Sequence, residues 1–367
     1  MILLEAGPGG IPVRFAAPRE VVAAWEADEV APSLARLDAA RAAGLWVAGY
    51  VAYEAGYALE PRLLPLMPEG REGPLLAFGI FDAPQAFETP GGEVLLTEAK
   101  PLVSRAAYGK AFRRIADWTR AGDCYQVNLT FPMAARVEGG AGALYAALAA
   151  RGAVGQGGLV DLGVGPAVVS RSPEVFFAVR GGVIRARPMK GTAPRGESPE
   201  EDARLSRNLF ESVKARAENL MIVDLLRNDI GRISQVGSVA VPELYAVEAF
   251  PTVHQMSSTV TGRLLGRPGL AGLMAALFPC GSVTGAPKIR AMEIIRAVEP
   301  HPRGAYCGAI GWMAPDGDAA FSVAIRTVSL WPGGRAVFGV GGGVVVDSTA
   351  DGEWEEALWK ARFAAPI

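Results

Sequence analysis

The sequence predicts an α+β fold in which layered, mainly antiparallel sheets carry helices on their outer faces. Three observations lead to this prediction. The chain has 367 residues, of which half are hydrophobic, so it can bury a large core. Strand-like and helix-like segments come in mixed blocks, without the strict alternation of a doubly wound parallel sheet. The length predicts two domains or one large domain.

The first 98 residues contain short apolar runs that predict strands separated by turns. Residues 46–53 and 74–81 are the clearest examples. No combination of side chains in this region indicates catalysis. We therefore predict an N-terminal subdomain, residues 1–98, packed on a catalytic region of residues 99–367.

Two helices and one strand are predicted early in the catalytic region. Ser104 is a typical N-cap and Gly122 a typical helix end, and residues 125–131 read as the strand that follows. The segment Ser198-Pro199-Glu200-Glu201 combines an N-cap, a first-turn proline and a capping-box glutamate. We expect this second helix to continue, with one break, to about Asn228.

The rest of the chain predicts mostly strands and one last helix. Apolar runs with β-branched residues predict strands, and the C-terminal segment has helical periodicity. The predicted strands are residues 175–179, 236–241, 319–330 and 335–346, and the predicted helix is 352–363.

Charge and histidine content exclude several functions. The chain has 36 Lys and Arg against 38 Asp and Glu, a net charge of −2, so nothing favours a nucleic acid or an acidic membrane surface as a partner. His254 and His301 are the only histidines, which excludes a histidine-rich metal centre. Residues 281–288 and 339–344 fail the phosphate-loop and dinucleotide patterns, so we expect neither ATP nor a dinucleotide.

Cysteine content and hydropathy predict a cytoplasmic protein. Three scattered cysteines, Cys124, Cys280 and Cys307, suit a reducing compartment better than a disulfide framework. The first residues lack the basic segment of a signal peptide. The longest uncharged run, between Arg267 and Lys288, is interrupted by prolines and cannot form one membrane-spanning helix.

Two predicted helices place carboxylates beside apolar faces. Glu218 shares a helix face with apolar residues, and a carboxylate buried there needs a cation beside it. Glu353, Glu356 and Lys360 share one face of the last helix. Carboxylates from two helices, without a cluster of His or Cys, favour Mg²⁺ over Zn²⁺. The alternative is a set of exposed or salt-bridged surface residues.

Lys190 and Glu174 are candidates for covalent and acid–base chemistry. Lys190 lies between an apolar residue and a Gly-Thr turn, where burial would lower its pKa and free the amine for attack. Glu174 opens an apolar strand and suits a general acid with a raised pKa. The glycines of 339–343 offer backbone N–H groups to an anion. The alternatives are a solvated loop lysine, a surface glutamate at a strand end, and a tight turn.

Eight segments follow one another in a recognisable order from about Gly122 to Arg362. They are residues 122–130, 172–174, 188–192, 217–229, 281–288, 302–308, 324–327 and 341–360. In this order they closely resemble the chorismate-utilising enzymes, a family that includes anthranilate synthase component I, isochorismate and salicylate synthases, and aminodeoxychorismate synthase component I. The first hundred residues resemble it only weakly, through residues 49–54. The resemblance implies a layered α/β/β/α sandwich of two large, mainly antiparallel sheets with outer helices.

Two positions indicate which branch of the family this chain resembles. Lys190 occupies the Lys-Gly-Thr motif that the resemblance associates with aminodeoxychorismate synthases, where anthranilate synthases usually carry Ala. Gln126 stands where isochorismate-type enzymes carry the lysine that activates water, which argues against water as the nucleophile. The resemblance therefore implies amination of chorismate to 4-amino-4-deoxychorismate, a transaminase-class reaction that leads to p-aminobenzoate and folate.

The resemblance also implies roles for single residues. Lys190 adds at C2 of chorismate while Glu174 protonates the leaving C4 hydroxyl, and ammonia then attacks C4 and expels the lysine. Mg²⁺ is expected on Glu218 and Glu356, with Glu353 in support. Ala215 stands where relatives often carry an acid, three residues before the first of these ligands. His254 matches an active-site histidine, and the expected substrate-binding residues are Gly191, Thr192, Ser282, Tyr306, Arg326, Gly342, Gly343 and Lys360.

The expected partner is a glutamine amidotransferase subunit that delivers ammonia. This chain has no nucleophilic cysteine with a partner histidine in an amidotransferase motif. Two alternatives remain open at this point. The chain could be an anthranilate synthase component I, or a catalytically silent chorismate-binding regulatory subunit, although the presence of Lys190, Glu174, Glu218, Glu356 and Arg326 together argues against the latter.

Overall fold

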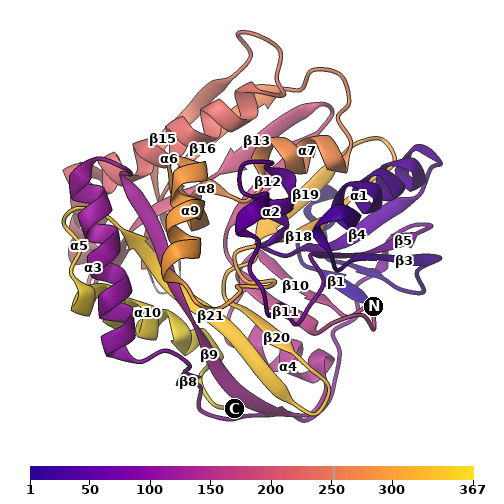
Figure 1. The fold of residues 1–367 in the computed structure, drawn as a ribbon, viewed down its shortest axis with the longest axis horizontal. Coiled ribbons are helices and arrows are strands. Elements are labelled where there is room, and N and C mark those ends of the chain that lie inside the picture. Colours follow the sequence, from indigo (N-terminus) through magenta and orange to yellow (C-terminus); the bar gives the residue numbers. More distant parts are fainter. Residues whose placement is uncertain (251–252) are drawn as a thin grey trace.

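The computed structural model describes residues 1–250 and 253–367, whose strands form two large sheets (Figure 1). The ladders between the described strands are antiparallel. Helices pack against the outer faces of both sheets. The predicted α+β class with two antiparallel sheets is confirmed.

The first sheet has eleven strands and the second has ten. The order in the first is β17 (Gly285–Ala286), β9 (Gln126–Glu138), β21 (Arg335–Val344), β20 (Thr327–Leu330), β11 (Ala167–Ser172), β10 (Gln156–Val160), β1 (Ile2–Leu4), β2 (Val13–Phe15) and β6 (Gln85–Ala86), with β7 (Leu95–Leu96) and β8 (Lys100–Pro101) beside β9. The order in the second is β14 (Met189–Pro194), β16 (Val253–Arg263), β13 (Val183–Arg187), β12 (Val175–Arg180), β19 (Ala319–Val323), β18 (Ala309–Met313), β4 (Trp46–Val51), β5 (Leu76–Phe81) and β3 (Glu20–Ala24), with β15 (Ala240–Ala249) beside β16.

The α-helices lie at both sides of these sheets. They are α1 (Ala27–Ala42), α2 (Ala55–Leu59), α3 (Arg105–Ala121), α4 (Ala141–Ala149), α5 (Pro199–Glu211), α6 (Val213–Gly231), α7 (Leu270–Leu277), α8 (Gly281–Thr284), α9 (Lys288–Val298) and α10 (Ala350–Ala361). Short 3₁₀ turns are η1 (Pro8–Gly10), η2 (Leu64–Leu66) and η3 (Arg362–Ala364). Within the described ranges, none of these helices has the length and apolarity needed to span a membrane.

The core fills the space between the sheets and under the helices. Phe15 of the first sheet and Tyr50 and Ile310 of the second belong to one buried cluster, so the two sheets pack face to face. On the outer face of the first sheet, Trp354 of α10 stacks on Phe131 of β9 with ring centroids 4.5 Å apart. Figure 1 shows α3 and α10 beside the long strands β9 and β21, and α1 with the N-terminal strands at the opposite side.

The first 98 residues contribute strands to both sheets. β1 pairs with β10 in the first sheet, and β4 pairs with β18 in the second. The predicted boundary at residue 98 stays a prediction, and strands from both sides of it share each sheet.

The two helices predicted from their caps are present. The Ser104 hydroxyl accepts a hydrogen bond from the Ala107 N–H at the start of α3, and Gly122 ends the helix with φ +83°. The Ser198 hydroxyl likewise accepts from Glu201 N–H at the start of α5. The predicted break lies at Ser212, which separates α5 from α6.

Two predicted elements need correction. Residues 319–330 form two strands in different sheets, because the chain turns between them at Arg326, whose φ is +50°. The strand predicted over 236–241 begins only at Ala240, and Val236 is fully exposed. The strand predicted over 335–346 is confirmed as β21, and the glycines of 339–343 lie inside it and pair with β9.

Candidate active site

Lys190 lies in a bulge of the edge strand β14. Met189 faces Ser257 and Thr192 faces Gln255, so β14 advances three residues while β16 advances two. Gly191 takes up the extra length with φ +92°, a conformation that favours glycine. The bulge turns the Lys190 side chain out of the regular strand alternation and toward charged groups from other elements.

The Lys190 amine lies among four charged side chains. Burial lowers the pKa of Lys190, and the ammonium of Lys360 acts in the same direction. The carboxylates of Glu218, Glu174 and Glu356 oppose this effect without reversing it. An amine with a lowered pKa has a larger unprotonated fraction near neutral pH, which is the form that acts as a nucleophile.

Glu174 lies where the chain crosses from the first sheet to the second. It follows the last residue of β11 by two positions and precedes β12, and its side chain is 5% exposed. Burial raises the pKa of Glu174 to about 7, although the Ser282 hydroxyl and the Lys190 ammonium oppose the rise. Within the described ranges, its Oε1 has no hydrogen-bond partner. Such a carboxyl group can donate a proton near neutral pH.

Helix α10 places Glu353, Glu356 and Lys360 beside the glycines of β21. Lys360 Nζ donates to the Gly341 carbonyl at 2.9 Å and lies 2.7 Å from Glu356 Oε1. A methyl group at Gly342 would lie 2.8 Å from Glu353 Oε2 and 3.5 Å from Lys360 Nζ. The absence of a side chain at Gly342 therefore leaves space in front of these charged groups.

The two α10 carboxylates differ in pKa. Burial and the neighbouring charge of Glu356 raise the pKa of Glu353, while the Ser348 hydroxyl, 2.7 Å away, acts against the rise. Burial also opposes ionisation of Glu356, but Lys360 outweighs it and lowers the pKa of Glu356. A cation between the two carboxylates would offset the repulsion that the Glu356 charge exerts on ionised Glu353.

Glu218 approaches the site from helix α6. Its carboxylate lies 3.9 Å from Lys214 Nζ, and its charge acts on Lys190. Ala215, one helical turn earlier, packs against the bulge, since a methyl group at Gly191 would lie 3.0 Å from its Cβ. The donor chemistry of Glu218, Glu353 and Glu356 suits Mg²⁺. Among residues 1–250 and 253–367, however, no three acidic, His or Cys side chains already stand at ligand spacing.

Gln126 of β9 lies against Gly343, the residue that follows Gly342 in β21. A methyl group at Gly343 would lie 3.1 Å from Gln126 Nε2. Gln126 has no solvent exposure, and neither amide atom has a hydrogen-bond partner in the part of the chain that the structure describes. Buried amides without partners are rare and costly, and a ligand that supplies the missing hydrogen bonds is one explanation for them.

Arg326 and Tyr306 lie on neighbouring segments. The Cys307 N–H donates to the Ala324 carbonyl at 2.9 Å, which joins the segment of Tyr306 to the turn that carries Arg326. Burial lowers the pKa of Arg326, and no ion pair to it is found within the described ranges. The Tyr306 ring lies against Gly339, where a methyl group would clash at 2.0 Å. A partly buried guanidinium without an ion pair among the described residues can bind a substrate carboxylate.

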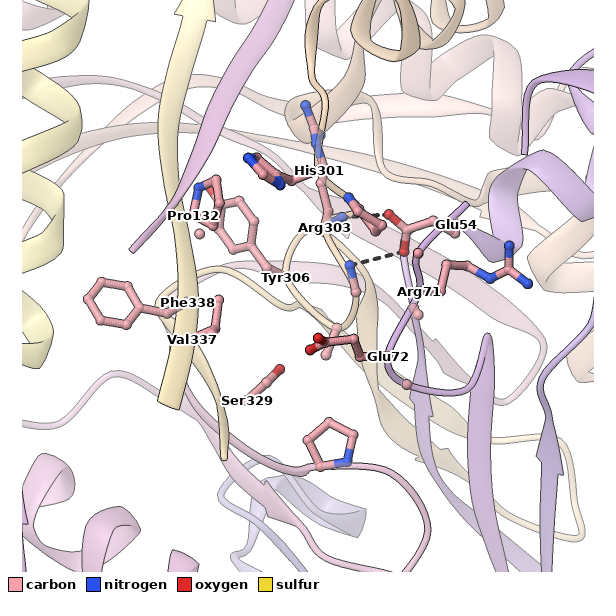
Figure 2. A pocket seen from close by; sticks show the side chains of 18 of the residues that line it. Glu54, Arg71, Glu72, Pro132, His301, Arg303, Tyr306, Ser329, Val337 and Phe338 are labelled. Atoms are coloured by element: carbon pink, nitrogen blue, oxygen red, sulfur yellow. Dashed lines mark hydrogen bonds between the residues drawn. The ribbon is translucent and has the colours of Figure 1, made fainter. Parts of the chain in front are cut away.

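A cavity of about 230 Å³, called the second cavity below because neither Lys190 nor Glu174 lines it, is shown in Figure 2. Tyr306 lines it together with Glu54 and Arg303, whereas Lys190 and Glu174 do not. Glu54 accepts hydrogen bonds from the backbone N–H groups of Arg303 and Gly304 at 2.6 and 3.0 Å, the contacts dashed in Figure 2. Burial raises the pKa of Glu54 to about 6. The Glu54 carboxylate on the wall of this cavity is therefore paired within the protein.

His254 is not directed at the Lys190 amine. Its Nε2 lies 2.9 Å from Asp202 Oδ1 of α5, and the Arg195 guanidinium holds the pKa of Asp202 well below its usual range. Adjacent residues of a strand point to opposite faces. The side chain of Gln255, the next residue, contacts the bulge instead. No motif in the sequence marks Gln255, because its contact with the bulge follows only from the register of β16 against β14.

A model of chorismate binding enzymes matches residues 83–366. The chain belongs to this family. Among its relatives, aminodeoxychorismate synthase component 1 of Klebsiella aerogenes is 47% identical over 260 residues, 71% of this chain and 57% of that protein. Anthranilate synthase component 1 of Thermus thermophilus is 42% identical over 259 residues, 71% of this chain and 56% of that protein.

A solved structure of the family has the same fold. Anthranilate synthase component I from Streptococcus pneumoniae superposes with a TM-score of 0.82 and 26% identity, over 96% of this chain and 91% of that chain. This confirms the predicted sandwich of two large sheets with outer helices. The chain spans less than two thirds of the length of the curated family members it matches.

The structure therefore assembles most of the residues predicted for a chorismate-family site. Lys190, Glu174, Ser282 and Lys360 converge with the three carboxylates around the bulge and the β21 glycines. Gly191 lies in the bulge itself, and Thr192 lies at its end with an exposed side chain. Tyr306 faces the second cavity, and His254 faces α5.

Proposed function

We propose that the chain aminates chorismate at C4 and acts as an aminodeoxychorismate synthase component I, in the route to p-aminobenzoate and folate. The observation that carries this proposal is the Lys190 amine, with its lowered pKa, beside Glu174, whose pKa is about 7. The relatives of that name, at 41–47% identity, support it. Anthranilate synthases at 41–42% identity are the competing assignment.

The first step uses both groups. The unprotonated Lys190 amine forms a bond to C2 of chorismate, the ring double bond shifts, and the C4–O bond breaks. Glu174 donates its proton to the departing hydroxyl, which leaves as water. A carboxyl group with a pKa of about 7 is still partly protonated at neutral pH and can supply that proton.

The second step regenerates the free Lys190 amine. Ammonia forms a bond to C4, the double bond shifts back, and the C2–N bond to Lys190 breaks. Glu174, now ionised, accepts the proton that the incoming ammonia loses. Two allylic displacements thus replace one direct exchange of hydroxyl for amine.

The substrate carboxylates need cationic partners. We assign this role to Arg326, with Tyr306 and Lys360 in support and the backbone N–H groups of Gly342 and Gly343 beside them. We also propose Mg²⁺ on Glu218, Glu356 and Glu353, because a carboxylate donor set suits it and the Gly342 backbone leaves space before Glu353. When bound, the ion supplies charge that neutralises and orients the ring carboxylate.

We further propose that a glutamine amidotransferase subunit supplies the ammonia, because the relatives are named as a first component. The purified chain should then use ammonium salts but release no ammonia from glutamine. Release of ammonia from glutamine by the chain alone would contradict this. The three buried free cysteines fit a reducing compartment, so we propose a cytoplasmic location.

A product assay tests the function. The chain is incubated with chorismate, MgCl₂ and ammonium chloride, with and without an aminodeoxychorismate lyase. The proposal predicts p-aminobenzoate only when the lyase is present, and no anthranilate fluorescence. Lys110→Ala, which changes an exposed lysine of α3, serves as the matched control for Lys190→Ala and should retain full activity. Direct formation of anthranilate would overturn the proposal.

A further inference from the structure

Gln255 joins the bulge that carries Lys190 to the neighbouring strand. Its backbone lies in β16, between β14 on one side and β15 on the other. Its side-chain Nε2 donates to the Gly191 carbonyl at 2.9 Å, and its Oε1 accepts from the Thr192 hydroxyl at 3.1 Å. Both ends of one amide are therefore used on the two residues that follow Lys190.

These contacts lie where the bulge interrupts the ladder between β14 and β16. Two β14 residues, Lys190 and Gly191, lie opposite one residue of β16, and a bulge of this kind leaves backbone groups without their ladder partners. The Gly191 carbonyl accepts its hydrogen bond from a side chain. The Gln255 side-chain NH₂ group donates to this carbonyl. The opposite orientation of the amide is disfavoured, because it would place the Gln255 Oε1 atom against the Gly191 carbonyl oxygen, and neither oxygen carries a proton.

The other side of Gly191 is closed by helices. A methyl group at Gly191 would lie 3.0 Å from the Ala215 Cβ of α6 and 3.3 Å from the Leu209 Cδ1 of α5. Gly191 is therefore confined between the two helices and the Gln255 amide. The peptide that follows Lys190 has little freedom to rotate, and the direction of the Lys190 side chain depends on that peptide.

We infer that Gln255 is a positioning residue for the Lys190 amine. The inference rests on the proposed function, in which this amine attacks the substrate. Gln255 does not itself touch the amine in any described contact. It holds the bulge in the conformation that directs Lys190 toward Glu174, so its loss should slow the chemical step more than it weakens substrate binding.

Two variants of Gln255 test this. Gln255→Met keeps the approximate length of the side chain and removes both hydrogen bonds. Gln255→Glu keeps the shape, but its carboxylate has no proton for the Gly191 carbonyl. We expect kcat to fall about tenfold to a hundredfold in each, with KM for chorismate within about threefold of wild type.

A control on the same strand isolates the effect. Thr259→Val removes hydrogen bonds to Glu243 and from Arg185, far along β16 from the bulge, and should leave kcat unchanged. Thermal unfolding of all three variants reports any general loss of structure. An unchanged kcat in Gln255→Met and Gln255→Glu, or an equal loss in Thr259→Val, would overturn the inference.

A second readout does not depend on turnover. The rate at which an amine-reactive reagent labels Lys190, followed by mass spectrometry of the digested protein, reports how the amine is presented. This rate should change several-fold in both Gln255 variants and stay constant in Thr259→Val. If wild type forms no aminated product, the proposed function fails, while the labelling rates still decide whether Gln255 positions Lys190. Equal labelling rates in all variants would refute the positioning role.

Discussion

Two buried polar regions of this molecule are constructed in opposite ways. Beside the second cavity, Arg303 donates to both oxygens of Glu299 at 2.7 and 2.8 Å and to two backbone carbonyls. Glu299 also accepts from the N–H and hydroxyl of Thr130. Around Lys190, in contrast, Gln126 and Glu174 retain amide and carboxyl atoms without partners in the part of the chain that the structure describes.

This difference indicates that the Arg303–Glu299 network has a structural role and that the Lys190 region is a site for chemistry. A buried polar group that finds its partner within the protein stabilises one conformation, whereas an unpartnered one costs free energy. The cost is tolerated where a substrate supplies the missing partner. The two regions meet at residues 281–285, since Arg303 also donates to the Val283 carbonyl, one residue from Ser282.

The largest expected effect is on the structural network. Arg303→Met leaves the Glu299 carboxylate buried without its cation, because both side chains are at most 6% exposed. We expect the free energy of unfolding to fall by about 3 to 5 kcal/mol, measured by urea denaturation. Arg204→Met breaks an exposed pair with Glu201 and should cost less than about 1 kcal/mol. Equal losses in the two variants would remove the contrast between the regions.

The second effect concerns catalysis. Glu174→Gln keeps the shape of the side chain but cannot donate an acidic proton, so we expect kcat to fall about 10²-fold or more, with little change in KM. Steady-state kinetics with ammonium as the nitrogen source measures this. Glu211→Gln, at the exposed end of α5, is the matched control and should keep wild-type kinetics. A wild-type kcat in Glu174→Gln would exclude Glu174 as the acid.

The raised pKa of Glu174 also predicts how the stability of the protein depends on pH. Glu174 faces Lys190, Ser282 and Cys280, and its pKa is raised from 4.5 to about 7. The folded protein therefore binds more protons than the unfolded chain between these values, and the stability contributed by protonated Glu174 is lost as pH rises through about 7. The limb of the wild-type kcat profile that reports protonated Glu174 should fall as pH rises above about 7, and Glu174→Gln should lack this limb. At pH 8, Glu174→Gln should unfold at a higher temperature than wild type, and a lower one would contradict this assignment.

The smallest effect is expected at Gln126. Gln126→Met replaces two unpartnered amide atoms with an apolar group of similar volume, so the free energy of unfolding should rise by about 1 kcal/mol. Calorimetry measures the shift in Tm, with Gln235→Met, at an exposed position, as the neutral control. A clear fall in Tm for Gln126→Met would show that this amide has hydrogen-bond partners in the folded protein.

Local signals in the sequence predicted much of the fold. The caps at Ser104 and Ser198 place helix starts that the structure confirms, because capping depends on residues within one turn. The run 319–330 was predicted as one strand, because no glycine marks the turn at Arg326 and a positive φ is rare for arginine. The division of that run between two sheets is decided by tertiary packing.

The residues of the candidate site that belong to sequence motifs were predicted, and the contacts that depend on strand register were not. Lys190, Glu174 and the α10 carboxylates were identified, and the structure brings them together. The contacts of His254 and Gln255 depend instead on which face of β16 meets the bulge. A shift of one residue in register exchanges the two faces of a strand, and the sequence alone contains no measure of that register.

The central claim is that Lys190 becomes covalently bound to the substrate. Intact-protein mass spectrometry of the chain incubated with chorismate and MgCl₂, without ammonium, tests it most directly. The account predicts a wild-type species heavier by chorismate minus one water, mapped to Lys190, which disappears when ammonium is added and is absent in Lys190→Ala. Full turnover by Lys190→Ala, with no adduct on the wild-type chain, would contradict the account.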